Sequence, residues 1–207
     1  MIDKLKQTVK KSEMINLPTQ WGMFKMMCYT ECDTQKEHLV LVYGNVDGLK
    51  NCLIRVHSEC ATGDIFKSLK CDCGPQLDLA MKMVVEEGAG IIIYLKQEGR
   101  GIGIVNKINA YKLQEQGFDT VEANEKLGFS PDLRTYELAA MVLNDFGIQD
   151  VRLITNNPAK VVGLQDLGIQ ISNTVPIKVA TNKHNESYIK VKQVKMDHCF
   201  DTNIITN

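Results

Sequence analysis

The pattern of hydrophobic and polar positions changes character partway along the chain. The first 60 residues contain short apolar runs with partial alternation, namely WGMFKMMCY, EHLVLVYGNVDG and NCLIRVHSE. Alternation with a period of two is typical of strands with one buried face, and the Asp47-Gly48 pair is a turn signal between two of these runs. The pattern therefore predicts a β-rich portion over about residues 15–60.

From about residue 74 onward, apolar positions recur at helical spacing and alternate with short apolar runs. The helical segments each end in a glycine, which suits a helix stop, and they cover residues 75–88, 106–117, 132–147 and 156–168. The apolar runs read as buried strands and cover residues 90–95, 150–155 and 169–177. This alternation predicts an α/β fold class: a sheet covered by helices in the C-terminal two-thirds, with a β-rich N-terminal portion.

Composition and charge exclude several classes of protein. The 207 residues carry a formal net charge of −1, which provides no basic surface of the kind that holds nucleic acid. The longest apolar runs, such as residues 91–95, are far shorter than the roughly 20 residues of a membrane span, and the charged N-terminus lacks the apolar core of a signal peptide. The chain contains seven cysteines, an odd number, and it is too long to be a small disulfide-stabilised scaffold. The cysteines are therefore expected to be reduced thiols, as in cytoplasmic proteins. We therefore expect a cytoplasmic protein with no nucleic-acid or membrane partner.

Three of the cysteines fall within the segment CATGDIFKSLKCDC. Cysteine thiolates are preferred zinc ligands, and a Cys-x-Cys pair with a third cysteine upstream predicts a metal site at Cys60, Cys71 and Cys73. His57 could complete a closed site of three cysteines and one histidine, or water could occupy the fourth position of a catalytic zinc. The alternative is that these cysteines are reduced structural residues that bind no metal.

The run RVHSE, directly before Cys60, places Arg55, His57 and Glu59 on alternate positions. Alternate residues of a strand share one face, so a cation, an imidazole and a carboxylate would lie together beside the cysteines. This arrangement suits a pocket for a polar substrate, although a solvated edge strand would show the same pattern.

Two predicted strand-to-helix junctions have the features of phosphate-binding sites. In KQEGRGIGIVNK, glycines allow the backbone to approach a ligand closely, and Arg100 stands beside the start of the next helix, whose free N–H groups bind anions. In TNNPAK, an asparagine cap and Pro158 precede Lys160 at a second helix start. Each motif alone is also consistent with a plain turn or an ordinary capped helix.

The segment GFSPDLR places Asp132 and Arg134 near a predicted helix N-terminus, where the helix dipole alone already favours a carboxylate. Tyr111 reads by itself as an aromatic residue on a helix face. A candidate zinc site, two candidate phosphate sites and several cationic side chains together predict hydrolysis of a phosphorylated small molecule such as a nucleotide.

The order of these motifs resembles that of the GTP cyclohydrolase II family. The matching segments are RVHSECATGD, CDCGxQ, QEGRGIG, NKIxAY, DTVEANxxLGFxxDxR and TNNPxK, and the resemblance spans roughly residues 17–198. It implies one domain over residues 1–200, with the β-rich part at about 15–60, the α/β part at about 74–200 and a loose tail at 201–207. This domain is often fused to a dihydroxybutanone-phosphate synthase, for which 207 residues leave no room, so a monofunctional protein is expected. Members of the family are typically homodimers, so the resemblance also implies a homodimer.

The resemblance also implies the reaction, which is hydrolysis of GTP to 2,5-diamino-6-(5-phosphoribosylamino)pyrimidin-4(3H)-one, formate and pyrophosphate, the first committed step of riboflavin biosynthesis. It implies one catalytic zinc at Cys60, Cys71 and Cys73, whose water attacks C8 of guanine, and Mg²⁺ on the triphosphate. The family's GTP-contacting positions correspond here to Arg55, Val56, His57, Ser58, Glu59, Gln76, Glu98, Gly99, Arg100, Thr120, Thr155 and Lys160.

Three further residues match catalytic positions of the family. Asp132 matches the proton acceptor, Arg134 the residue assigned as nucleophile toward the α-phosphate, and Tyr111 a tyrosine of the ring-opening chemistry. Because a guanidinium group is essentially always protonated, Arg134 is better suited to stabilise charge developing on the α-phosphate. Lys70 departs from the arginine expected before Cys71, which keeps the charge but loses bidentate geometry.

Three other functions are consistent with parts of the pattern. A zinc deaminase shares a His-x-Glu motif followed by cysteines, but the single-residue gap in Cys-x-Cys and the lack of Pro-Cys match it poorly. A family variant could open the ring and retain the formyl group, against which the presence of Tyr111 argues. A zinc-stabilised nucleotide-binding protein without turnover would be expected to lack catalytic residues that this chain contains.

Overall fold

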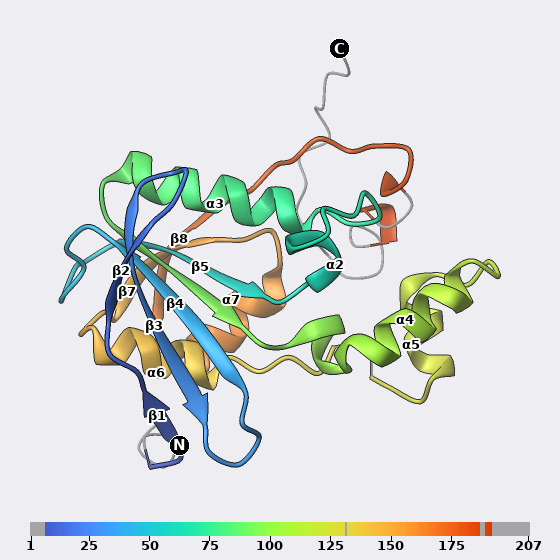
Figure 1. Ribbon diagram of the computed structural model, residues 1–207, viewed down its shortest axis with the longest axis horizontal. Coiled ribbons are helices and arrows are strands. Elements are labelled where there is room, and N and C mark those ends of the chain that lie inside the picture. The colour runs from blue at the N-terminus through green and yellow to red at the C-terminus, as the bar shows by residue number, and fades with distance from the viewer. Residues whose placement is uncertain (1–6, 131, 187–188, 192–207) are drawn as a thin grey trace.

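The computed structural model describes residues 7–130, 132–186 and 189–191. Its centre is an eight-stranded sheet with the order β1-β3-β4-β6-β5-β7-β8, and β2 also pairs with β3. The strands are β1 (Val9–Lys11), β2 (Ile15–Pro18), β3 (Met23–Glu31), β4 (Glu37–Tyr43), β5 (Cys52–Ser58), β6 (Gly90–Leu95), β7 (Asp150–Ile154) and β8 (Gln170–Val175). The β-rich first part of the chain and the later α/β part therefore share one sheet (Figure 1).

The sheet is antiparallel in its first part and parallel in its second. β3 pairs antiparallel with β4, and β4 pairs antiparallel with β6. β6, β5, β7 and β8 run parallel to one another. The residues of β5 and β6 are almost all buried, as expected for parallel strands that are covered on both faces.

Helices cover both faces of this sheet. The helical elements of the structure are α2 (Ala61–Asp64), α3 (Cys73–Glu87), the 3-10 helix η1 (Glu98–Gly101), α4 (Gly103–Gln114), α5 (Thr120–Lys126), α6 (Glu137–Asp145) and α7 (Pro158–Gln165). α3 packs on one face through Ala80 and Val84, whereas α6 and α7 contribute to the larger core cluster on the other face. Figure 1 shows α3 and α6 on opposite sides of the strands.

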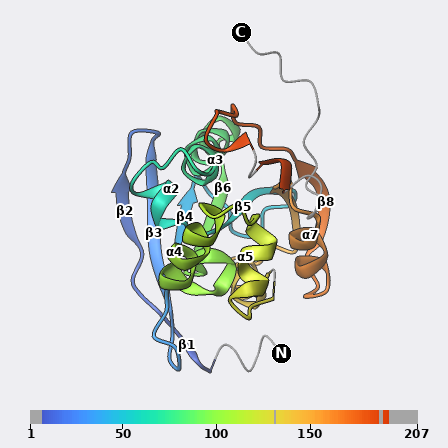
Figure 2. The same cartoon turned by 90° about the vertical axis from the view of Figure 1, so that its right-hand side faces the viewer.

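The strand order creates a crevice between β5 and β7. From β5 the chain passes through α3 to β6, which lies on one side of β5 in the sheet. It later continues to β7, which lies on the other side of β5. In open α/β sheets, ligands usually bind where the strand order reverses in this way, outside the carboxyl ends of the strands. α4 and α5 pack on each other beyond these strand ends (Figure 1), and Figure 2 shows them in front of the sheet.

The structure confirms the α/β fold class and most of the predicted elements. Gly88, which follows α3, adopts the left-handed conformation with φ 86°, and the Asn157 side chain caps α7 by accepting from the Ala159 amide. α5 was not predicted from the apolar pattern, although Asp119 and Glu122 form a capping box at its start. Within the described residues, no helix has the length and apolar character to cross a bilayer.

α4 begins and ends three residues earlier than predicted. The predicted start of α6 was also wrong, and this boundary concerns two candidate catalytic residues. α6 begins at Glu137, so Asp132 and Arg134 lie in the segment before the helix and not at its N-terminus. The Leu133 amide donates to the Arg100 carbonyl at 3.0 Å, and the Asp132 carboxylate accepts from the Arg134 amide at 3.0 Å. These bonds hold the segment against η1 and replace the hydrogen bonds that an earlier helical turn would make. The predicted tail at 201–207 lies outside the described residues.

Candidate active site and metal centre

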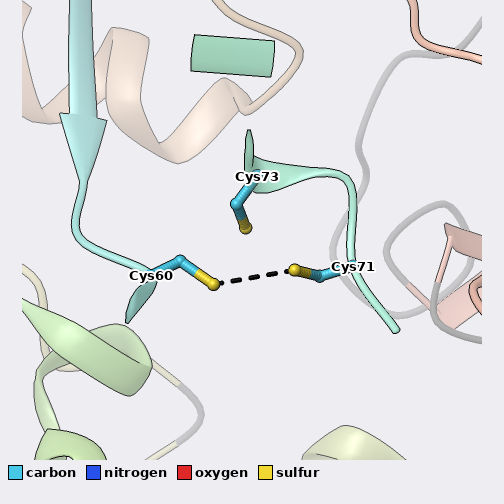
Figure 3. Close-up of side chains that lie close together, drawn as sticks. All are labelled: Cys60, Cys71 and Cys73. Carbon is cyan, nitrogen blue, oxygen red and sulfur yellow. Dashed lines mark hydrogen bonds between the residues drawn. The ribbon is translucent and has the colours of Figure 1, made fainter. Parts of the chain in front are cut away.

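Two segments that leave the sheet region bring three cysteine side chains together. Cys60 follows β5, Cys71 lies in the loop after α2, and Cys73 is the first residue of α3 (Figure 3). The three Sγ atoms lie within 4.8 Å of one another, and Cys60 Sγ is 3.6 Å from Cys71 Sγ. Thiolates around a tetrahedral zinc, with Zn–S near 2.3 Å, are roughly 3.8 Å apart, whereas disulfide sulfurs are about 2.05 Å apart. The geometry fits a zinc site and does not fit a disulfide.

His57 is held by another partner and does not join this cluster. Its Nε2 atom lies 3.2 Å from both carboxylate oxygens of Asp64. Asp64 also accepts from the Cys60 amide at 2.9 Å and from the Tyr94 hydroxyl at 2.8 Å, and burial lowers the pKa of His57. Within the described part of the chain, the cluster of possible metal ligands contains the three cysteines alone. The closed site with His57 is therefore not supported, and a tetrahedral zinc would keep an open fourth position, as catalytic zinc sites do.

The thiols face a cleft at the carboxyl ends of β5, β6 and β7. The predicted site residues that line it are Arg55, His57, Ser58, Glu59, Cys60, Cys71, Cys73, Gln76, Glu98, Gly99, Arg100, Tyr111, Thr120, Arg134, Thr155 and Lys160. Val56 and Asp132 are not among its lining residues. The Val56 side chain is fully buried in the core, and its carbonyl accepts a hydrogen bond from Lys160 Nζ at 2.5 Å.

Arg100 offers the clearest anion-binding group in the cleft. Its φ of 61° is rare for a residue with a side chain, and it follows Gly99, which has the same φ. The Nη1 and Nη2 atoms of Arg100 are buried and make no hydrogen bond within the described residues. Buried cationic donors are normally paired, so this unpaired guanidinium points to a negatively charged ligand such as a phosphate.

Other charged residues of the cleft are bound mainly by the protein itself. Arg55 Nη1 donates to the Ile154 carbonyl at 2.9 Å, and its Nη2 donates to Gln76 Oε1 at 2.7 Å, which ties β5 to β7 and to α3. Burial lowers the pKa of Arg55 to about 10, so the group stays charged at neutral pH. Glu98 accepts from the Ala61 amide at 2.6 Å and from its neighbour's amide, that of Gly99, at 2.8 Å. These contacts fix the walls of the cleft.

Asp132 and Arg134 form a two-pronged ion pair at the edge of the cleft. Arg134 Nε donates to Asp132 Oδ1 at 2.8 Å, and Arg134 Nη2 donates to Oδ2 at 2.5 Å. Burial alone would raise the pKa of Asp132, but the hydrogen bonds and charge of Arg134 outweigh it and lower that pKa. The pair therefore remains ionised at neutral pH, and Asp132 holds the guanidinium in a fixed orientation.

The cleft thus combines three thiols whose geometry fits a zinc site with cationic groups at the ends of three parallel strands. The family model described as GTP cyclohydrolase II matches residues 10–176. The chain belongs to the GTP cyclohydrolase II family. All of the thiol and guanidinium groups described above lie within the matched range.

Curated relatives of this GTP cyclohydrolase II chain are named riboflavin biosynthesis protein RibBA. The RibBA proteins of Bacillus velezensis and Bacillus subtilis are each 51% identical over 191 residues, which are 92% of this chain and 48% of each relative. RibBA of Aquifex aeolicus is 49% identical over 193 residues, which are 93% of this chain and 48% of that protein. The chain therefore spans about half the length of the curated relatives it matches.

One solved structure is more distantly similar. It is the crystal structure of RibBX, a two-domain 3,4-dihydroxy-2-butanone 4-phosphate synthase from A. baumannii. The superposition has a TM-score of 0.45 with 19% sequence identity and covers 84% of this chain and 41% of that chain.

Tyr111 of this GTP cyclohydrolase II chain lines the cleft from α4. Burial raises the pKa of Tyr111 to about 12, so its hydroxyl is protonated at neutral pH and can act as a hydrogen-bond donor. Lys70 Nζ lies 5.1 Å from the centre of the Tyr111 ring and 3.4 Å from Glu115 Oε1. The lysine that replaces the expected arginine thus makes a cation–π contact with Tyr111 and an exposed ion pair.

Sequence reasoning missed two residues that support the thiols. Asp64 accepts hydrogen bonds from Cys60 and Tyr94, and Lys107 Nζ lies 3.0 Å from Cys60 Sγ. Lys107 precedes Tyr111 by four residues, so both side chains were predictable on one face of the helix. Nothing in the local sequence indicated that this face would meet Cys60.

Replacing Gly74 with alanine is expected to disrupt the metal centre. A Cβ atom at position 74 would lie 2.3 Å from the carbonyl oxygen of Gly63, a backbone atom of the segment that follows Cys60. The two cysteine-bearing segments would have to move apart, so we expect loss of bound zinc and a decrease of about 1–3 kcal/mol in the free energy of unfolding. Metal analysis and chemical denaturation measure the two effects.

Gly48→Ala is the control for this substitution. Gly48 has φ 64°, and no atom of the described residues beyond its chain neighbours lies within 4 Å of a Cβ placed there. An alanine at this site meets only backbone strain, roughly 1–2 kcal/mol, and should keep its zinc. Equal zinc contents in the two variants would contradict the predicted clash between the cysteine segments.

Proposed function

We propose that this chain catalyses the zinc-dependent hydrolysis of GTP to a diaminopyrimidine ribosyl phosphate, formate and pyrophosphate. The observation that carries the proposal is the cleft itself, which is lined both by three thiols within 4.8 Å of one another and by the unpaired guanidinium of Arg100. A site for zinc and a site for phosphate in one cleft are what hydrolysis of a purine ring in a nucleotide requires. Family membership supports GTP as the nucleotide.

The thiols would hold zinc, which when bound supplies a Lewis acid that lowers the pKa of a coordinated water molecule to near neutral. Cys60 and Cys71 are buried, which keeps bulk water away from the sulfur atoms. Tyr111 lines the same cleft, and its protonated hydroxyl would donate a hydrogen bond to the purine as its ring opens.

The phosphates would bind on the side of the cleft that carries Arg100 and Arg134. Arg100, in the turn after β6, would donate hydrogen bonds to the phosphates through its buried Nη1 and Nη2 atoms. Arg134, held in place by Asp132, would stabilise the negative charge that develops on the α-phosphate while pyrophosphate leaves. Mg²⁺ would neutralise the triphosphate and orient the leaving group.

Oligomeric state and location are part of the same proposal. A homodimer is expected from the resemblance to the family, and the cytoplasm suits the six free cysteines among the described residues.

The test is an assay of purified, zinc-loaded protein with GTP and Mg²⁺ in which formate and pyrophosphate are quantified together. We expect equal yields of the two products, loss of both after chelation of zinc, and recovery when zinc is restored. Pyrophosphate without formate would contradict hydrolysis of the ring and leave only nucleotide cleavage. Ring opening without formate would instead indicate an enzyme that retains the formyl group.

A further inference from the structure

Lys107 is a buried cation that the proposed reaction does not yet use. It projects from α4, its side chain is 11% exposed, and its Nζ atom donates to Glu98 Oε1 at 2.8 Å. The same Nζ atom lies 3.0 Å from Cys60 Sγ, a close contact for a nitrogen donor and a sulfur acceptor. A lysine that served only as the ion partner of Glu98 would have no reason to approach the sulfur.

The contacts around Lys107 form a closed ring of interactions. Glu98 accepts from Lys107 through Oε1 and from the amide of Ala61 through Oε2 at 2.6 Å. Ala61 directly follows Cys60. The Glu98 carboxylate is therefore hydrogen-bonded both to the backbone next to Cys60 and to Lys107, whose Nζ atom contacts the Cys60 thiol. Rotation of the Cys60 side chain would break the contact with Lys107. Movement of the backbone at Cys60 and Ala61 would break the hydrogen bond from the Ala61 amide to Glu98.

The negative charge of the three thiolates explains why a cation would lie beside Cys60. Three thiolates overcompensate the charge of a divalent zinc ion, so the occupied centre would be left with an excess negative charge in a buried environment. The ammonium of Lys107 is paired with the Glu98 carboxylate at 2.8 Å and lies 3.0 Å from Cys60 Sγ. A cationic donor therefore stands next to the sulfur whose charge needs compensation.

We propose that Lys107 is a positioning residue of the metal centre, which donates a hydrogen bond to the Cys60 thiolate, offsets its charge and holds it toward the other two thiols. The inference rests on the proposed zinc site. Groups that hydrogen-bond to metal ligands orient them and tune the metal, and their removal commonly weakens metal binding by about 10- to 100-fold. The ammonium of Lys107 has this relation to Cys60.

The experiment compares metal binding by wild type, Lys107→Met, Lys107→Arg and Lys112→Met. Methionine keeps the unbranched stem and removes the donor, and arginine restores a charged donor. Lys112 lies on the same helix with a side chain that is 71% exposed, so its variant is the matched control. Zinc dissociation constants are measured by competition with a chromophoric chelator, and Co²⁺ is added to the metal-free proteins to record the sulfur-to-cobalt charge-transfer band.

We expect Lys107→Met to bind zinc about 10- to 100-fold more weakly and to shift the cobalt band to lower energy, because a thiolate that loses a hydrogen bond gives up an electron more easily. Lys107→Arg should recover most of the affinity, and Lys112→Met should match wild type. Should Lys107→Met not fold, Lys107→Gln replaces it, since glutamine removes the charge but keeps a polar side chain in the cleft.

Unchanged zinc affinity and an unchanged cobalt band in a folded Lys107→Met protein would overturn the inference and leave Lys107 as a partner of Glu98 alone. This outcome differs from failure of the proposed function. Wild type that binds zinc but releases no formate would contradict the enzyme activity, while the metal-binding comparison would still decide the role of Lys107.

Discussion

Replacing Cys71 with serine is expected to remove zinc and to reduce formate release from GTP by at least about 100-fold. Cys71 is one of three thiols within 4.8 Å of one another, and no other metal-ligating side chain belongs to the cluster in the described residues. Two thiols and a weak hydroxyl ligand do not hold zinc as three thiolates do. A bound metal contributes several kcal/mol to stabilising a hydrolytic transition state, and each 1.36 kcal/mol is about tenfold in rate. Zinc content and formate yield are measured on the same preparation.

Cys32→Ser provides the control for this experiment, because Cys32 is an exposed free thiol outside the cluster. It should retain both zinc and activity. A Cys71→Ser protein that keeps the zinc content and formate yield of wild type would show that the three cysteines are structural, which is the alternative that the sequence left open.

Replacing Arg134 with methionine is expected to lower the release of pyrophosphate and formate by about 100- to 1,000-fold while zinc content stays unchanged. Arg134 is bound by both oxygens of Asp132, and the bond to Nη2 is 2.5 Å long. This pairing keeps the guanidinium charged, so we expect Arg134 to stabilise charge on the α-phosphate and not to act as the nucleophile. Arg134→Lys, which keeps the charge but not the two-pronged geometry, should therefore retain more activity than Arg134→Met.

Arg152→Met is the matched control for Arg134. Arg152 also pairs with a carboxylate, that of Glu87, but this pair is partly exposed and lies outside the cleft. We expect its activity to equal that of wild type. Equal inactivity of Arg134→Lys and Arg134→Met, together with a nucleotide covalently attached to wild-type protein in mass spectra, would instead identify Arg134 as the nucleophile.

The position of the site explains why its parts are dispersed in the sequence. The cleft is built at the crevice between β5 and β7, where the chain reverses its direction of travel across the sheet. Cys60 follows β5, Arg100 follows β6, and Lys160 lies in the first turn of α7, the helix that follows β7. Parallel strands place their carboxyl ends at one edge, so three distant segments meet there without any local signal that they should.

The types of secondary-structure element and the chemistry of the candidate site residues could be predicted from local sequence. Helical periodicity and the glycine at position 88 predicted α3, and the Asn157-Pro158 pair predicted the start of α7. The Cys-x-Cys spacing predicted metal binding, and Arg100 in a glycine loop predicted an anion site. These features depend on residues that are neighbours in the chain, so local geometry is sufficient to predict them.

Which of these groups lie in contact depends on how distant segments of the chain pack together. Lys107 Nζ lies 3.0 Å from the Sγ atom of Cys60, which is 47 residues away in the chain. His57 pairs with Asp64 and is therefore not among the candidate metal ligands. α6 begins at Glu137 and not at Asp132, because the Asp132 carboxylate accepts hydrogen bonds from the backbone and side chain of Arg134 before the helix begins. Such contacts follow from strand order and packing between distant segments, and local periodicity and residue spacing carry no information about them.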